Sequence, residues 1–128
     1  MSERPAIVQI IESIESDVQT RVVITLGWSD EEFHGESVGS SNPTSRPRLV
    51  GEATLRAVEA VTSDRLELSL AAVATTDLGV GQVAMAQVLM VGDPEPLVGS
   101  SLVRSDDEAA ATVRAVLDAL NRRIATVL

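Results

Sequence analysis

Two short sequence motifs each occur twice in this chain of 128 residues, and the order of their copies constrains the fold more than any other feature. V-G-S-S at residues 38–41 returns 60 residues later, and A-T-L-R-A-V at residues 53–58 returns as A-T-V-R-A-V 58 residues later. Both copies keep the order of strand end, loop and helix, and the difference in spacing falls in the loop, where insertions are tolerated. We predict one domain over residues 1–128, built from a unit used twice, at 1–62 and 63–128. The alternative is coincidence among the abundant Ala, Val and Ser residues.

Each unit reads as three strands followed by a helix. In the first unit the strands are expected at residues 5–14, 18–28 and 32–38, with a helix after Pro47. In the second they are expected at residues 65–76, 82–91 and 97–104, and Ser105 to Glu108 form a capping box that opens the last helix. The predicted fold is therefore α+β, with two tandem βββα units. We expect a two-layer sandwich, in which an antiparallel-rich sheet carries both helices on one face.

Two strands of the second unit are apolar at nearly every position. Only Glu67, Ser69 and Gln87 interrupt residues 66–74 and 83–91. This pattern is typical of strands that are buried on both faces, whereas a solvated face would show polar alternation. A single copy has nothing to cover the second face, so the sequence predicts a homodimer formed through the sheet face.

The composition excludes several classes of function. The formal net charge is -9, and all ten basic residues are arginine, so neither a nucleic acid nor an anionic membrane is an expected partner. Cysteine is absent, which removes disulfides, thiol catalysis and cysteine-based metal sites. No apolar run is long enough to span a bilayer. We therefore expect a cytoplasmic protein that needs no cofactor.

No group of residues matches a catalytic motif. His34 is the one histidine, and either it acts as a general base or metal ligand, or it is a surface histidine among the acids Glu31, Glu32 and Glu36, which we favour. The acids at 106–108 suit the first turn of a helix better than an acid/base pair. An enzyme is therefore not expected.

The loop at residues 39–48 is the best candidate for a binding site. It carries several hydroxyl groups together with Arg46, and it leads into a helix N-terminus, where free N–H groups favour anions. A small carboxylate or phosphate could bind there. The alternative, which we favour, is a solvated loop whose arginines offset nearby acids.

The run from Val98 to Arg123 resembles the end of the regulatory domain of 2-isopropylmalate synthase. The likeness lies in a G-x-S segment, an acidic link and a helix reading A-x-x-R-A-V-x-x-A-x-N-R. The resemblance implies a non-catalytic, dimerising regulatory module that binds a small effector, such as an amino acid, near the dimer contact. The implied ligand-binding residues are Gly39, Ser40, Gly99 and Ser100, to which the loop adds Ser41 and Arg46. The alternative is a purely structural interaction module without a small-molecule ligand.

Overall fold

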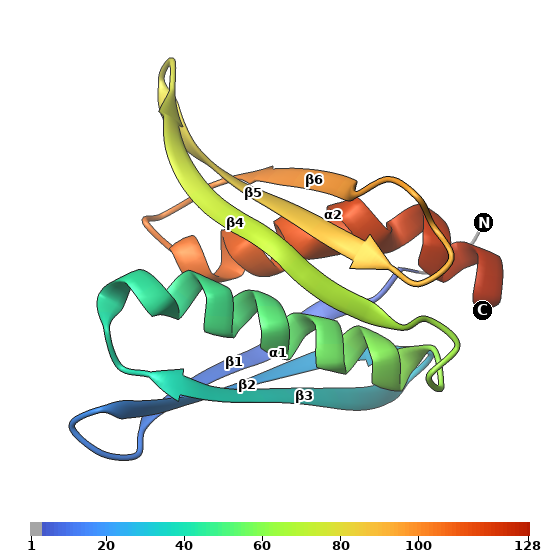
Figure 1. Cartoon of the computed structure of the whole chain (residues 1–128), viewed down its shortest axis with the longest axis horizontal. Helices are drawn as coiled ribbons and strands as arrows, with labels where there is room; N and C mark the ends of the chain where they lie inside the picture. The colour runs from blue at the N-terminus through green and yellow to red at the C-terminus, as the bar shows by residue number, and fades with distance from the viewer. Residues whose placement is uncertain (1–3) are drawn as a thin grey trace.

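The computed structural model describes residues 4–128, so residues 1–3 of the predicted first unit lie outside the described part. The chain forms six strands and two α-helices in the order βββα–βββα (Figure 1). The elements are β1 (Ala6–Ile14), β2 (Gln19–Trp28), β3 (Glu31–Ser40), a 3-10 turn η1 (Pro43–Ser45), α1 (Arg46–Val61), β4 (Leu68–Leu78), β5 (Gly81–Met90), β6 (Leu97–Leu102) and α2 (Glu108–Val127). The α+β class and the order of three strands and a helix, used twice, are thus confirmed.

The strands form two separate sheets, with the helices between them. One antiparallel sheet has the order β1-β2-β3, and the other has the order β4-β5-β6. Helix α1 packs on β2 and β3 of its own unit and on β4 of the other, while α2 packs mainly on β5 and β6 (Figure 1). The expectation of one sheet carrying both helices is corrected on this point. Each unit forms its own sheet, because short connections of two to six residues join its three strands.

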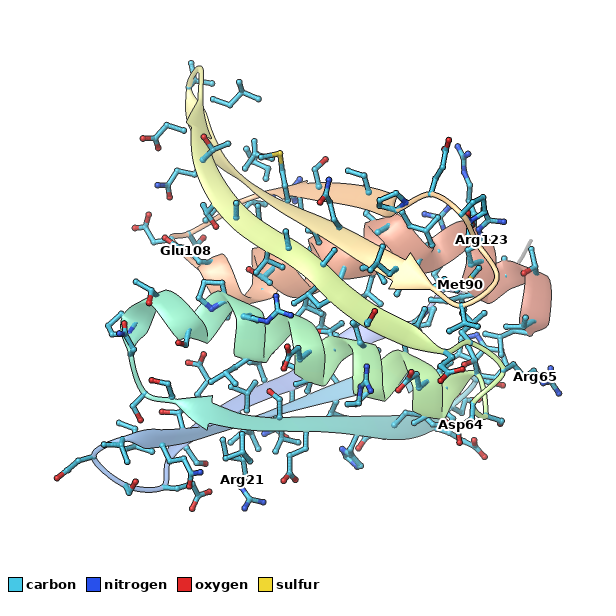
Figure 2. All side chains as sticks on the ribbon, in the orientation of Figure 1. Arg21, Asp64, Arg65, Met90, Glu108 and Arg123 are labelled. Carbon is cyan, nitrogen blue, oxygen red and sulfur yellow. The ribbon has the colours of Figure 1, made fainter. Side chains whose placement is uncertain are left out.

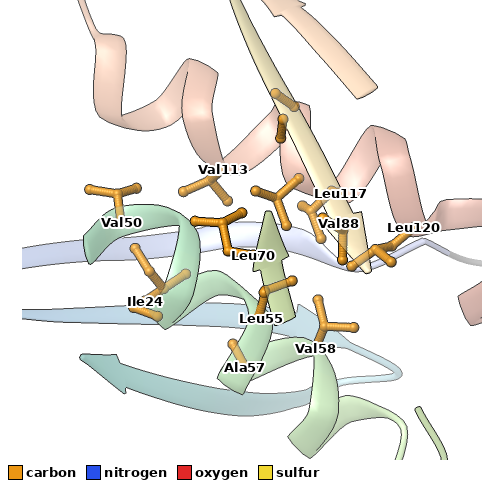
Figure 3. Packing of buried hydrophobic residues seen from close by; sticks show 14 of the residues in the cluster. Ile24, Val50, Leu55, Ala57, Val58, Leu70, Val88, Val113, Leu117 and Leu120 are labelled. Atoms are coloured by element: carbon orange, nitrogen blue, oxygen red, sulfur yellow. The ribbon is translucent and has the colours of Figure 1, made fainter. Parts of the chain in front are cut away.

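The core lies in the helix layer and is built from medium-sized aliphatic side chains. Both helices are buried over an apolar stripe, and the middle strands β2 and β5 contribute Ile24 and Val88 between them (Figure 3). Ile24, Leu55, Val58, Val88 and Val113 are all essentially inaccessible to solvent. Alanines on both helices keep the layers close, since a small side chain allows a near approach of backbones.

The start of α2 differs from the prediction. The N-cap is Asp107, whose Oδ1 accepts a hydrogen bond of 3.0 Å from the backbone N–H of Ala110. Ser105 lies in the preceding turn with a positive φ of 55°. The predicted capping box at 105–108 is therefore wrong by two residues, because Ser105 and Asp106 are used in a left-handed turn before the helix begins.

The two copies of a repeated motif also occupy different structural positions in the two units. Gly35, on β3, pairs with Ile24 of β2 and contacts the backbone of α1. Gly99, on β6, pairs with Ala86 of β5 and contacts the backbone of α2 in the same way. The structural counterpart of Gly99 is therefore Gly35, and Gly39 in the first V-G-S-S motif lies four residues further along its strand. The two units share one architecture, but the residues that correspond in the structure are not the ones that the repeated motifs align.

Candidate functional site

The loop predicted to bind a ligand lines a real cavity. Ser40, Ser41 and Arg46 surround a cavity of about 390 Å³ together with Glu12 of β1 and Thr20 of β2. Asn42 shapes the loop, because its side chain accepts a hydrogen bond of 3.0 Å from the Thr44 backbone N–H and so caps η1. Three of the six predicted site residues are thus brought together here.

The charge in this cavity is already paired. The guanidinium of Arg46 donates through Nε and Nη2 to the two carboxylate oxygens of Glu12, at 2.6 and 2.7 Å. This hydrogen bond is the main reason why the pKa of Arg46 is raised, against a smaller opposing effect of burial. The hydroxyls of Ser41 and Thr20 lie 2.8 Å apart and bond to each other. A carboxylate within the cavity opposes an anionic ligand, so the geometry favours the solvated-loop alternative for residues 39–48.

The predicted glycines have a packing role. A Cβ on Gly39 would lie 2.6 Å from Cδ2 of Leu49, and one on Gly99 would lie 2.2 Å from the backbone oxygen of Ala115. Both residues face the helix layer, and neither of them lines the loop cavity. Ser100 follows Gly99 on β6 and faces outward. Its backbone N–H donates to Oδ2 of Asp118 at 3.0 Å.

His34 lies exposed on the outer side of β3. Its Nδ1 is 2.8 Å from the hydroxyl oxygen of Thr25, a buried residue on the neighbouring strand. Among residues 4–128 no three His, Asp or Glu side chains gather in a group that could hold a metal ion. Neither helix of the described chain is apolar enough over its length to span a lipid bilayer.

The outer faces of the two sheets differ in charge. On the first sheet Arg21 projects away from the helices (Figure 2) and bridges Glu15 and Glu36 at 2.9 Å each. On the second sheet the strand pairing places alternate residues of β4, β5 and β6 on the outer side. None of these side chains is charged. We call this set the β4–β6 outer face; its members are Ser69, Ala72, Ala74, Thr76, Val83, Met85, Gln87, Leu89, Val98, Ser100 and Leu102.

Large apolar side chains on the β4–β6 outer face are open to solvent. Met85 is 40% exposed, Leu89 45% and Val98 64%. The β4–β5 hairpin projects beyond the helix layer (Figure 1), and Val80 at its tip is fully exposed. The sequence signal for this face was the near-continuous apolar run in β4 and β5, which indicated burial on both sides.

No protein-family model matches the sequence, and no curated protein matches it significantly. The resemblance to the regulatory domain of 2-isopropylmalate synthase therefore stays a prediction.

Proposed function

We propose that this chain is a non-catalytic assembly module that pairs with a second copy of itself through the β4–β6 outer face. The observation that carries this proposal is an uncharged and largely apolar sheet face on a chain whose net charge is -9. Apolar side chains exposed together over three neighbouring strands are uncommon on monomers and typical of interaction sites.

A second copy fits this face better than a different partner does. In a two-fold symmetric interface each residue near the axis meets its own copy, so a charge there would face a like charge. The β4–β6 outer face carries none. A partner recognised by electrostatic complementarity would need a charged patch, which this face does not offer. The outer face of the first sheet carries Arg21 and Glu36, so pairing of unlike faces would bury these charges.

The size of the face sets the expected strength. Three strands about 5 Å apart and at most about 30 Å long offer on the order of 450 Å² per copy, or about 900 Å² in total, which is the range of weak and transient interfaces. The projecting β4–β5 hairpin adds apolar surface at one end. We therefore expect a reversible dimer, whose population rises with protein concentration.

The regulatory role that the resemblance implies would act through this equilibrium. A small effector changes assembly only by its different affinity for the monomer and the dimer. A module that pairs without any effector is the structural alternative.

Sedimentation velocity over about 1 to 100 μM tests the pairing. We expect the wild-type protein to sediment as a dimer at the upper end, and Leu89→Glu to remain a monomer. Val38→Glu is the matched control, since Val38 is 44% exposed on the outer side of the first sheet and receives the same charge. This control should still dimerise. A wild-type monomer throughout, or loss of the dimer in Val38→Glu alone, would overturn the proposal.

A further inference from the structure

The two halves of the fold differ in how each helix contacts the first strand of the other unit, although the repeat predicts the same contact in both. Helix α1 is covered by β4 of the other unit, and Arg48 and Arg56 of α1 donate to the backbone oxygens of Leu70 and Leu68 at 3.0 and 2.8 Å. The corresponding contact of α2 would be with β1. There β1 touches α2 only loosely, and a cavity of about 500 Å³ lies beside the contact.

This cavity has residues from three segments of the chain. The start of the chain contributes Arg4 to Ile7, and β6 contributes Ser100. Helix α2 contributes Arg114, Leu117, Asp118 and Asn121. Its lining has no residue in common with that of the loop cavity at Arg46.

The charge in this cavity is unusual for so acidic a chain. Within residues 4–128, half of the arginines form ion pairs, and Arg4 and Arg114 belong to the other half, with Arg65, Arg104 and Arg122. Asp118 is the one carboxylate in the lining, and its Oδ2 already accepts from the Ser100 N–H. Two guanidinium groups against one carboxylate leave the cavity positively charged.

A further polar group in the lining lacks a partner. Oδ1 of Asn121 is shielded from solvent and accepts no hydrogen bond from the described residues. A buried polar atom without a partner is costly, but an atom that solvent does not reach is equally closed to a ligand in an open cavity, so the accessible acceptor in the lining is the exposed Asp118 carboxylate. The lining therefore offers donors from the arginines and an acceptor from Asp118 in one place.

We propose that this cavity binds a small oxyanion that also carries a hydrogen-bond donor, such as hydrogen phosphate or a hydroxycarboxylate. The guanidinium groups of Arg4 and Arg114 bind the anionic oxygens, since their planar donors match an oxyanion in pairs. The hydroxyl of the ligand donates to the Asp118 carboxylate, which lines the same cavity. Within the lining, Ser100 alone also belongs to the β4–β6 outer face, and the arginines that bind the anion lie outside that face, so the site does not require pairing through it.

Titration followed by ¹H–¹⁵N NMR tests the site, with sodium phosphate, lactate, acetate and chloride as probes at matched ionic strength. We expect saturable shifts at the Ser100 amide and the Asn121 side-chain amide with phosphate or lactate. Whichever of the two saturates first identifies the source of the oxyanion. Acetate, which has no hydroxyl donor, should bind more weakly, and chloride should give no saturation.

Arg114→Gln should weaken binding by about tenfold, because it removes one charged hydrogen-bonding group. Arg104→Gln is the matched control: Arg104 is exposed, forms no ion pair among residues 4–128 and lies outside the cavity. It should leave the affinity unchanged. Arg4→Gln provides a second variant if Arg114→Gln does not fold. Absence of saturation with both phosphate and lactate, or an equal loss in Arg104→Gln, would overturn the proposal.

Discussion

Gly35 and Gly99 occupy the same place in the two halves of the fold, each where an outer strand crosses the backbone of a helix. A Cβ on Gly35 would lie 2.0 Å from the backbone oxygen of Ala53 and 2.2 Å from the nitrogen of Ala57. A Cβ on Gly99 would lie 2.2 Å from the oxygen of Ala115 and 2.3 Å from the nitrogen of Ala119. Backbone atoms cannot move aside as a flexible side chain can, so each glycine sets the distance between its sheet and its helix.

Replacement of either glycine by alanine should therefore be strongly destabilising. We expect Gly35→Ala and Gly99→Ala each to lower the free energy of unfolding by at least about 2 kcal/mol, because the helix must shift away from the sheet. Urea unfolding measures the change. Glu32→Ala, an exposed change on β3, is the control and should alter stability by less than about 0.5 kcal/mol. Equal stability of the glycine variants and the wild type would contradict the close crossing.

The N-cap of α2 gives a second prediction. Asp107→Ala removes the hydrogen bond to the Ala110 N–H and a negative charge near the positive end of the helix, so we expect a loss of about 1 kcal/mol. Ser105→Ala should have a smaller effect, because the Ser105 side chain does not cap the helix. Thermal unfolding of the two variants side by side distinguishes them. A larger loss in Ser105→Ala would restore the capping box that the sequence predicted.

The order of the helices and strands could be predicted from the sequence, but which residues of the two units correspond could not. Hydrophobic alternation in residues 18–28 and the apolar stripe of the last helix placed their elements well, since period and secondary structure are directly linked. An alignment of the two units on the repeated V-G-S-S motif is wrong by four residues. The determinant of the true register is a glycine that meets a helix backbone, and a glycine facing a helix has the same letter as a glycine in a loop.

The sites depended on partners that sequence spacing does not reveal. Arg46 was a candidate anion ligand in a loop whose arginines were expected instead to offset nearby acids, and the acid that it contacts, Glu12, lies 34 residues away and becomes a neighbour only when β1 joins the sheet. Ser100 was predicted to bind a ligand, and it does line a cavity. The other residues of that cavity come from the start of the chain and from α2, so no local motif joins them.

The pair between Arg46 and Glu12 joins β1 to the start of α1, and its contribution should be small and sensitive to salt. The side chains are 55% and 29% exposed, so we expect Glu12→Gln to cost at most about 1 kcal/mol at low salt and less at 1 M salt. Chemical unfolding at both salt concentrations measures the cost. Glu95→Gln makes the same charge change at an exposed residue that forms no ion pair within residues 4–128, and it should be neutral.

The pH dependence of this pair follows from the raised pKa of Arg46. A cationic group whose pKa is higher in the folded state adds stability that is fully present below its unfolded pKa and is lost as the pH rises through its folded pKa. Because arginine titrates only at strongly alkaline pH, the stability difference between wild type and Glu12→Gln should be equal at about pH 7 and about pH 9. A difference that disappears by pH 9 would contradict this assignment.

The exposed edge of β4 is covered by side chains in place of a neighbouring strand. At Leu68 the backbone N–H donates to Oε2 of Glu59 at 3.0 Å, and the backbone oxygen accepts from Nη2 of Arg56 at 2.8 Å. Arg56 and Glu59 also pair with each other at 3.2 Å. Two side chains of α1 therefore satisfy both backbone groups of Leu68, which leaves this part of the edge closed to addition of another strand.

Removal of this cover should open the edge locally. We expect Glu59→Ala to raise the hydrogen-exchange rate of the Leu68 amide by at least about tenfold, because the lost bond is charge-assisted and Glu59 is largely buried. Exchange at Val88, on the middle strand, should change only as much as the global stability does. In a double-mutant cycle with Arg56→Ala the two changes should couple by about 0.5 to 1 kcal/mol, since both act on one residue. Unchanged protection of the Leu68 amide in Glu59→Ala would contradict the role of Glu59 in covering this edge.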